Sequence, residues 1–230
     1  MFLIYSVGMT LTERLYQAAA PIWQKSLAHP FITALGDGSL PLENFRFYMC
    51  QDYVFLIEYS RLLALATAKA PDLETMGRFA NLLDATLNQE MALHRSFAAE
   101  CGIPADVLAA TQAAPTARAY SSHLLRVASL GDVAETVAAM LPCQWGYAEI
   151  GQTLARRGKP AAAPFYGQWI DMYASPEFAA LSTWLREILD RLDASDGISN
   201  TERLTETFCT SARYEYLFWQ MAYRMEEWAV

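Results

Sequence analysis

The segment from Pro41 to Lys69 constrains the fold of this chain more than any other. Its proline stands at the start, where the first turn of a helix tolerates one, and the segment stays compatible with a helix to its last residue. Its apolar residues do not alternate with the period of two that a half-buried strand requires. A helix of this length spans on the order of 40 Å, and helices this long, joined by short turns, predict a bundle.

The rest of the chain divides into further helical segments separated by short turn signals. Only 11 glycines and 10 prolines occur in 230 residues, and no repeat or linker divides the chain. We therefore expect an all-α fold and a single domain over residues 1–230, with residues 1–9 as a candidate disordered or non-native N-terminal extension. The predicted helices lie at about 10–28, 41–69, 72–101, 116–130, 132–157, 161–173, 176–194 and 199–228.

Charge and cysteine content exclude several classes of protein. The chain has 25 Asp and Glu against 17 Lys and Arg. This net charge of -8 argues against binding to nucleic acid or to an acidic membrane surface, both of which require a basic protein surface. Its 4 cysteines form no C-x-x-C pair, which favours the cytoplasm over a disulfide framework or a zinc ribbon. The start of the chain lacks a basic segment, and no apolar run approaches the ~20 residues of a membrane span, so we expect neither a signal peptide nor a transmembrane helix.

A carboxylate interrupts an aromatic face of the segment 41–69. Four residues share this face at offsets of 0, 4, 7 and 11: Tyr48, Asp52, Phe55 and Tyr59. The charged residues of the segment lie on the opposite side, as expected for a solvated face. A buried carboxylate costs free energy unless it is paired or hydrogen-bonded. Asp52 is therefore either a structural hydrogen-bond anchor or a substrate contact, and the pattern weighs the two about equally.

The last predicted helix shows the same anomaly more strongly. Glu215 shares a face with Phe218 and Trp219, whereas Arg213 and Arg224 lie on another side. Desolvation among aromatic rings would raise the pKa of this carboxyl group, and a raised pKa lets a carboxyl group donate a proton near neutral pH. An ion pair with an arginine of a neighbouring helix explains the pattern equally well.

A proline interrupts the predicted helix 132–157 next to a cysteine. Pro142 precedes Cys143, and Tyr147 lies one turn further along the same face. A proline inside a helix frees backbone groups and can open a side chain toward a cavity. Most lone cysteines are inert core residues, so packing is the commoner role for Cys143 and nucleophilic catalysis is the alternative.

Metal and haem sites have weak support in the sequence. Glu90 and His94 share a helix face, but the pair of Glu-x-x-His motifs that marks a di-iron bundle is absent. We therefore expect a structural role for His94. His29 precedes Pro30 in what we interpret as the end of the first helix, and nothing further supports haem ligation by His29.

Short motifs in a specific order run through nearly the whole chain. They are Trp23 with His29-Pro30-Phe31, Gly36-Asp37-Gly38, Phe45 to Gln51-Asp52, Glu90-Met91-Ala92-Leu93-His94, Tyr120-Ser121-Ser122-His123, Leu141-Pro142-Cys143 through Tyr147-Ala148-Glu149, Trp169 to Tyr173, Tyr214-Glu215-Tyr216-Leu217-Phe218-Trp219 and Met221-Ala222-Tyr223-Arg224. Together they resemble the TenA proteins, thiaminase II, whose members adopt the haem-oxygenase-like helical fold.

The resemblance implies roles for the three unusual side chains. It makes Cys143 the nucleophile, Glu215 the acid/base and Asp52 the group that holds an aminopyrimidine, and it places the chain in the cysteine-bearing class of the family. It also implies aromatic walls around the pyrimidine, formed by Phe55, Tyr120, Tyr147, Tyr173 and Phe218. Many members carry tyrosine at the position of Phe55. Stacking survives this change, but a hydrogen bond worth about 1 kcal/mol is lost, which would tune substrate preference.

The implied reaction is a covalent hydrolysis. The Cys143 thiolate adds to an electron-poor ring carbon while Glu215 protonates a ring nitrogen, and the ring then expels the group on its exocyclic methylene, which water replaces. The substrate is 4-amino-5-aminomethyl-2-methylpyrimidine or thiamin, and the product, 4-amino-5-hydroxymethyl-2-methylpyrimidine, serves thiamin salvage. The resemblance implies a homotetramer, and the reaction requires no cofactor and no metal. Two alternatives stay open: a cofactor-binding oxidase or oxygenase on the same fold, and a non-catalytic pyrimidine-binding protein.

Overall fold

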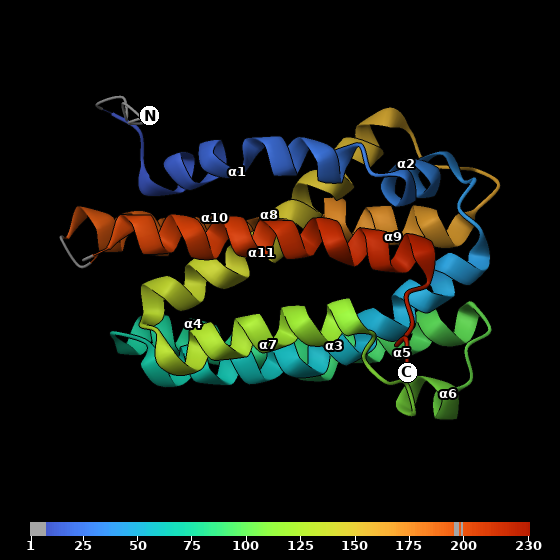
Figure 1. Ribbon diagram of the computed structural model, residues 1–230, viewed down its shortest axis with the longest axis horizontal. Coiled ribbons are helices and arrows are strands. Elements are labelled where there is room, and N and C mark those ends of the chain that lie inside the picture. The colour runs from blue at the N-terminus through green and yellow to red at the C-terminus, as the bar shows by residue number, and fades with distance from the viewer. Residues whose placement is uncertain (1–7, 196–197, 199) are drawn as a thin grey trace.

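The computed structural model describes residues 8–195, 198 and 200–230, and in this part of the chain long helices run side by side in one elongated bundle (Figure 1). No strand occurs among the described residues, so the predicted all-α class is confirmed. Residues 1–7 of the predicted extension lie outside the described residues. In chain order the elements are α1 (Leu11–Leu27), α2 (Pro30–Asp37), α3 (Leu42–Lys69), α4 (Leu73–Ala85), the π-helix η1 (Thr86–Glu90), α5 (Met91–Glu100), α6 (Ala105–Ala109), α7 (Pro115–Leu130), α8 (Val133–Arg157), α9 (Pro164–Ala174), α10 (Pro176–Ala194) and α11 (Thr201–Arg224).

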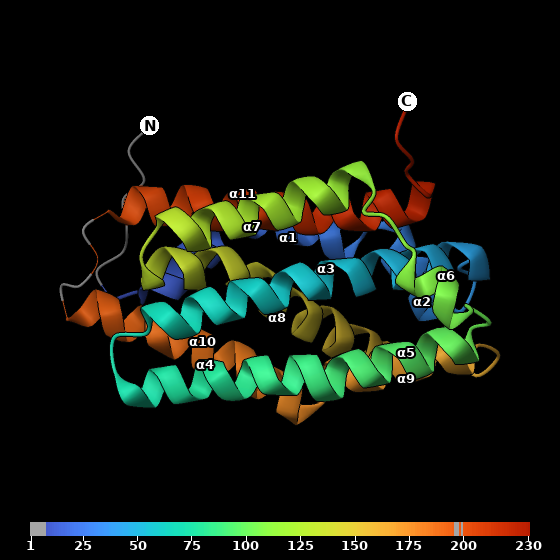
Figure 2. The same ribbon diagram turned by 90° about the horizontal axis from the view of Figure 1, so that it is seen from below.

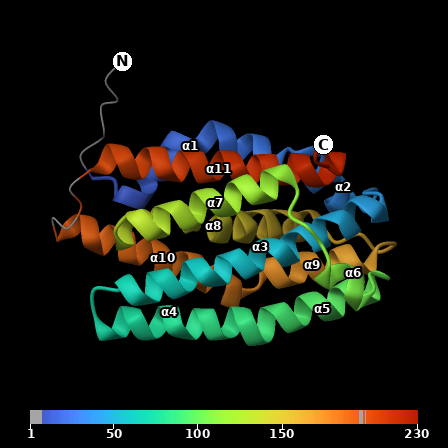
Figure 3. The same cartoon turned by 60° about the horizontal axis from the view of Figure 1, so that its bottom comes forward.

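The central helix of the bundle is α8, which packs against α3, α7, α9, α10 and α11 (Figure 3). Every residue from Val137 to Pro142 is apolar and buried, as expected for a helix surrounded by other helices. The helix begins at a capping box, in which the Asp132 side chain accepts from the Glu135 amide and the Glu135 side chain accepts from the Asp132 amide. This arrangement places Cys143, in the middle of α8, at the centre of the molecule.

The segment predicted as one helix over 72–101 is one rod with a defect in its middle. Asp72 caps α4, and α4, η1 and α5 follow one another along α3 (Figure 2). The five residues of η1, Thr86–Glu90, form a π-helix. A π-turn holds an extra residue and therefore rotates the residues that follow relative to an ideal helix, which hydrophobic periodicity does not reveal.

Each predicted helix end lies within about four residues of the observed one, but two helices, α2 and α6, were missed. Pro30 not only follows the end of α1 but also begins α2, where the His29 ring accepts from the Phe31 amide at 3.1 Å. The short α6 was not predicted, and α9 begins at Pro164 because proline favours the first position of a helix. The last helix ends at Arg224 because Met225 adopts a left-handed conformation with φ 49°.

The hydrophobic core draws residues from every described α-helix. The C-terminal tail beyond α11 folds back over the start of α7, where the Trp228 indole donates to the Ala113 carbonyl at 3.0 Å. None of the described helices combines the length and apolar character that crossing a membrane requires.

Candidate active site

Five helices bring the eight predicted site residues into one buried cluster. The helices are α3, α7, α8, α9 and α11, and the residues are Asp52, Phe55, Tyr120, Cys143, Tyr147, Tyr173, Glu215 and Phe218. Seven of them are buried, and Cys143 alone keeps partial exposure. Residues more than 150 positions apart in the chain thus meet at one place, and none of the eight lies elsewhere.

Glu215 interacts with two other members of the cluster. The Tyr120 hydroxyl donates to Glu215 Oε1 at 2.5 Å, and the Cys143 thiol lies close enough to this carboxyl group for each to shift the pKa of the other. Burial raises the pKa of Glu215 to about 7, although the hydrogen bond from Tyr120 acts in the opposite direction. Among the described residues no arginine pairs with Glu215, so the structure favours a carboxyl group poised to exchange a proton near neutral pH.

Asp52 is anchored by a neighbour on its own helix. The Tyr48 hydroxyl lies 3.2 Å from Asp52 Oδ2 and donates to it, and the same hydroxyl accepts from the Trp169 indole at 3.2 Å. Burial raises the pKa of Asp52 to about 7. Asp52 therefore has the hydrogen-bond partner that the interpretation as a structural anchor requires. One hydrogen bond leaves the carboxyl group with further acceptor capacity, so a substrate contact is compatible with this anchor.

Cys143 is a thiol in the resting protein. Burial is the main cause that raises its pKa well above the ordinary value, and Glu215, Asp52 and Glu90 raise it further through their negative charge. A cysteine in this setting is not a preformed thiolate. It becomes a nucleophile only when a neighbouring base takes its proton, and Glu215 is the neighbouring carboxyl group that can do so.

Aromatic rings pack around these three groups. The Phe55 ring lies 5.1 Å from the Tyr120 ring and 5.6 Å from the Phe218 ring, measured between centroids. The Tyr147 and Tyr173 rings lie 4.7 Å apart on the other side of the cluster. Phe55 therefore makes the aromatic contacts of its position but has no hydroxyl group. These rings supply flat apolar faces of the kind on which a heteroaromatic ring stacks.

The approach of α9 to α8 depends on one glycine. A Cβ atom at Gly151 would lie 2.5 Å from the carbonyl carbon of Tyr173, closer than real contacts permit. The absence of a side chain at this position lets the backbone of α9 pack directly on α8 and brings Tyr173 into the cluster.

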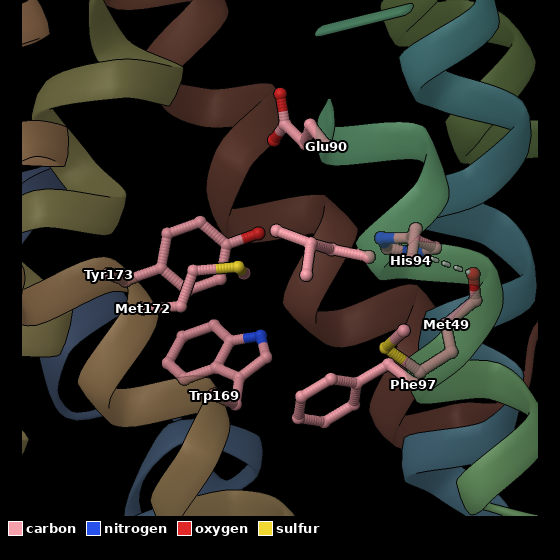
Figure 4. Close-up of a pocket in the computed structure, with 8 residues that line it drawn as sticks. Met49, Glu90, His94, Phe97, Trp169, Met172 and Tyr173 are labelled. Carbon is pink, nitrogen blue, oxygen red and sulfur yellow. Dashed lines mark hydrogen bonds between the residues drawn. The ribbon is translucent and has the colours of Figure 1, made fainter. Parts of the chain in front are cut away.

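Glu90 and His94 lie beside the cluster on the π-helix and α5. Figure 4 shows Glu90, His94 and Met49 on one side of a cavity and Trp169 and Tyr173 on the other, with the His94 ring directed toward the Met49 carbonyl. His94 Nε2 lies 3.0 Å from the Met49 carbonyl oxygen and 3.7 Å from Asp52 Oδ2, and both contacts agree with the predicted structural role of His94. Burial and the charge of Asp52 raise the pKa of Glu90 to about 7.

Sequence reasoning missed part of the cluster. Tyr48 and Tyr59 were recognised on the Asp52 face but not included among the site residues, although their spacing of four and seven residues from Asp52 was a usable signal. Gln144 also contacts the cluster, since its Nε2 donates to the Tyr59 hydroxyl at 3.1 Å. The two ring nitrogens of His29 contact Gln220 and the Phe31 amide, so His29 is not directed at the cluster as a haem ligand.

Cavities border the cluster on several sides. One is lined by Pro142, Glu215 and Trp219, and the one in Figure 4 includes Tyr173 and Glu90 in its wall. Each has a volume of about 20 Å³, which holds about one water molecule. A wider cavity of about 340 Å³ shares Glu90 with the one in Figure 4 and reaches Gln144. Space for a small ring compound therefore lies in the wider cavity, beside Glu90 and Gln144.

Comparison with solved structures identifies the fold. A TenA homologue from P. horikoshii matches with a TM-score of 0.87 and 32% identity, covering 94% of this chain and 99% of that chain. A domain with a heme oxygenase-like fold from Shewanella denitrificans matches with a TM-score of 0.74 and 14% identity, covering 95% and 94% of the two chains. The predicted haem-oxygenase-like helical bundle is thereby confirmed.

Comparison with known sequences gives the same result. An aminopyrimidine aminohydrolase from Halalkalibacterium halodurans is 47% identical over 224 residues, which are 96% of this chain and 98% of the relative. A family model described as TENA/THI-4/PQQC matches residues 16–225, a range that holds all eight members of the buried cluster. The chain belongs to the TENA/THI-4/PQQC family, as the order of its motifs predicts.

Proposed function

We propose that this protein is an aminopyrimidine aminohydrolase of thiamin salvage, with 4-amino-5-aminomethyl-2-methylpyrimidine as its substrate and thiamin as a second one. The observation that carries the proposal is the contact between the Cys143 thiol and Glu215 inside an aromatic cluster that also holds Asp52. The close similarity to proteins named aminopyrimidine aminohydrolase gives independent support.

The reaction begins with the transfer of one proton. Glu215 takes the proton of the Cys143 thiol, and the sulfur adds to the electron-poor ring carbon beside a ring nitrogen. Glu215 gives the same proton to that nitrogen, so the adduct forms without net charge transfer to the protein. A carboxyl group with a pKa of about 7 suits both halves of this transfer.

The adduct then breaks down in two steps. The ring amino group supplies the electron pair that expels ammonia from the exocyclic methylene, which leaves a cationic ring with an exocyclic double bond. Water adds to the methylene carbon and releases a proton, and the sulfur leaves as Glu215 takes back the proton of the ring nitrogen. The net change is replacement of an ammonium group by a hydroxyl group, with release of ammonium.

Asp52 holds the aminopyrimidine in register with the nucleophile. The edge of the ring presents an amino donor next to a nitrogen acceptor, and a neutral carboxyl group offers the matching acceptor and donor. The raised pKa of Asp52, about 7, keeps part of this group protonated near neutral pH. Tyr48 fixes the orientation of the carboxyl group through its hydrogen bond. The flat rings of Phe55, Tyr120, Tyr147, Tyr173 and Phe218 supply the walls on which the pyrimidine stacks.

An ammonia-release assay with the purified protein tests the proposal. We expect ammonia and hydroxymethylpyrimidine in equal amounts from the aminomethylpyrimidine. Tight binding of hydroxymethylpyrimidine without turnover of either substrate would instead support a binding protein. A visible absorption band, or iron in stoichiometric amount, would support an oxidase.

The proposal also includes the domain organisation, the cellular location and the oligomeric state of the protein. The core that draws on every described α-helix supports a single domain over residues 1–230. Free cysteines at positions 50, 101, 143 and 209 support residence in the cytoplasm, and the family resemblance supports a homotetramer.

A further inference from the structure

A cavity outside the catalytic cluster has polar groups that the reaction above does not use. It has a volume of about 340 Å³ and lies between η1, α8 and α10. It shares Glu90, Leu93 and Met172 with the inner cavity of Figure 4, so the two cavities lie side by side against these side chains. Its wall also includes Gln144, which directly follows the nucleophile in the chain. The cavity therefore adjoins the catalytic cluster at Glu90 and Gln144.

Gln144, a residue of this wall, carries an unsatisfied acceptor. Its side chain is 6% exposed, and its Nε2 donates to the Tyr59 hydroxyl, which fixes the orientation of the amide. The other amide atom, Oε1, is buried and has no hydrogen-bond partner. A buried acceptor without a donor costs free energy, so native proteins rarely leave one unless a ligand or water meets it. Here the missing partner is an N–H or O–H donor.

Glu90 places a carboxyl group in the same wall. It lies close enough to Asp52, Cys143 and Tyr173 to interact with them electrostatically. The lining of the cavity holds a second carboxyl group, Glu177, and no lysine or arginine. The groups around Glu90 thus offer hydrogen-bond acceptors and negative charge. His94 is the one basic side chain among the groups that shift the pKa of Glu90.

We propose that Glu90 and Gln144 form the subsite for the cationic leaving group of the substrate. An aminomethyl substituent is protonated in water and has three N–H donors, which a carboxylate and an amide oxygen can accept together. The thiazolium ring of thiamin is also a cation at this position. The hydroxymethyl product has no charge there, so the subsite favours substrate over product. This inference rests on the proposed function and extends it to substrate selection.

Binding measurements on an inactive background test the subsite. The Cys143→Ser protein is compared with the double variant that also carries Glu90→Gln, using calorimetry with the aminomethylpyrimidine and with the neutral hydroxymethylpyrimidine. A charge-assisted hydrogen bond is lost in the second protein, so we expect the Kd of the cationic ligand to rise about tenfold to a hundredfold. The Kd of the neutral ligand should change less than about twofold.

Two further variants separate the subsite from a structural effect. Glu100→Gln removes an exposed carboxyl group of α5 outside the cavity and should change neither Kd. Gln144→Met removes the unsatisfied acceptor and should weaken the cationic ligand more than the neutral one. It gives a second test if Glu90→Gln does not fold.

The outcomes distinguish this inference from the proposed function. Equal weakening of both ligands by Glu90→Gln, or no weakening of either, would overturn the subsite while ammonia release by the wild type remained intact. Failure of the wild type to release ammonia, together with failure of the Cys143→Ser protein to bind either pyrimidine, would overturn both.

Discussion

Replacement of Glu215 by glutamine should inactivate the protein and stabilise it at the same time. Burial raises the pKa of this carboxyl group from 4.5 to about 7 in the folded protein. The folded state therefore holds a proton between these two values that the unfolded state releases. Stability falls as the pH rises through this window, and the full loss is present above pH 7. At about 1.4 kcal/mol per pH unit, the difference corresponds to about 3 kcal/mol.

Glutamine keeps the shape of the side chain and an acceptor for Tyr120 but has no charge to desolvate. The free energy of unfolding of Glu215→Gln should thus exceed that of the wild type by about 3 kcal/mol at pH 8, and by little at pH 4.5. For a domain of this size the gain corresponds to a rise in Tm of about 5–10 °C. Ammonia release should fall at least about a hundredfold, because proton transfer loses its base.

Denaturant titrations of both proteins at pH 4.5 and pH 8, with an ammonia-release assay at pH 8, measure these effects. Glu206→Gln on the same helix removes an exposed carboxyl group and should leave both stability and turnover unchanged. A stability difference that is the same at both pH values would refute the argument from desolvation. Loss of pyrimidine binding with turnover retained at saturation would reduce Glu215 to a positioning group.

Two other substitutions test the packing of the site. Tyr48→Phe removes the hydroxyl group that hydrogen-bonds to both Asp52 and Trp169. It should lower the free energy of unfolding by about 1–3 kcal/mol in a denaturant titration. An unchanged unfolding midpoint would count against a contribution of these hydrogen bonds to stability. Gly151→Ala should cost about 1–3 kcal/mol and weaken pyrimidine binding because α9 must move away from α8. Its control, Gly77→Ala, adds a methyl group that meets nothing within 4 Å and should be neutral or stabilising, so equal effects of the two changes would contradict the close-packing argument.

The sequence predicts those parts of the site that leave a local signature. Asp52 and Glu215 each stand on an apolar helix face, where helical periodicity alone marks a carboxyl group as unusual. The role of Cys143 depends on the family resemblance, since a lone cysteine in a helix has no distinctive pattern. The structure adds the partners: the Tyr120 hydroxyl reaches Glu215 from another helix, whereas Tyr48 lies one turn before Asp52 on the same helix.

The parts that could not be predicted depend on tertiary contacts or on irregular backbone. Glu90 looks like an ordinary helical residue because the π-helix that positions it has no distinct periodicity. Gly151 matters only because the backbone of another helix comes close to it. The unsatisfied oxygen of Gln144 is a property of its buried surroundings and cannot be read from residue type. Helix α2 was missed because Pro30 was interpreted as a stop alone, although proline also starts helices.

The role of Cys143 is the central claim, and ammonia release by Cys143→Ser tests it most directly. The serine keeps the size and polarity of the side chain but lacks the nucleophilic sulfur. We predict that the variant loses nearly all release of ammonia from the aminomethylpyrimidine while still binding hydroxymethylpyrimidine with the affinity of the wild type. Turnover by the serine variant at the rate of the wild type would contradict covalent catalysis at Cys143.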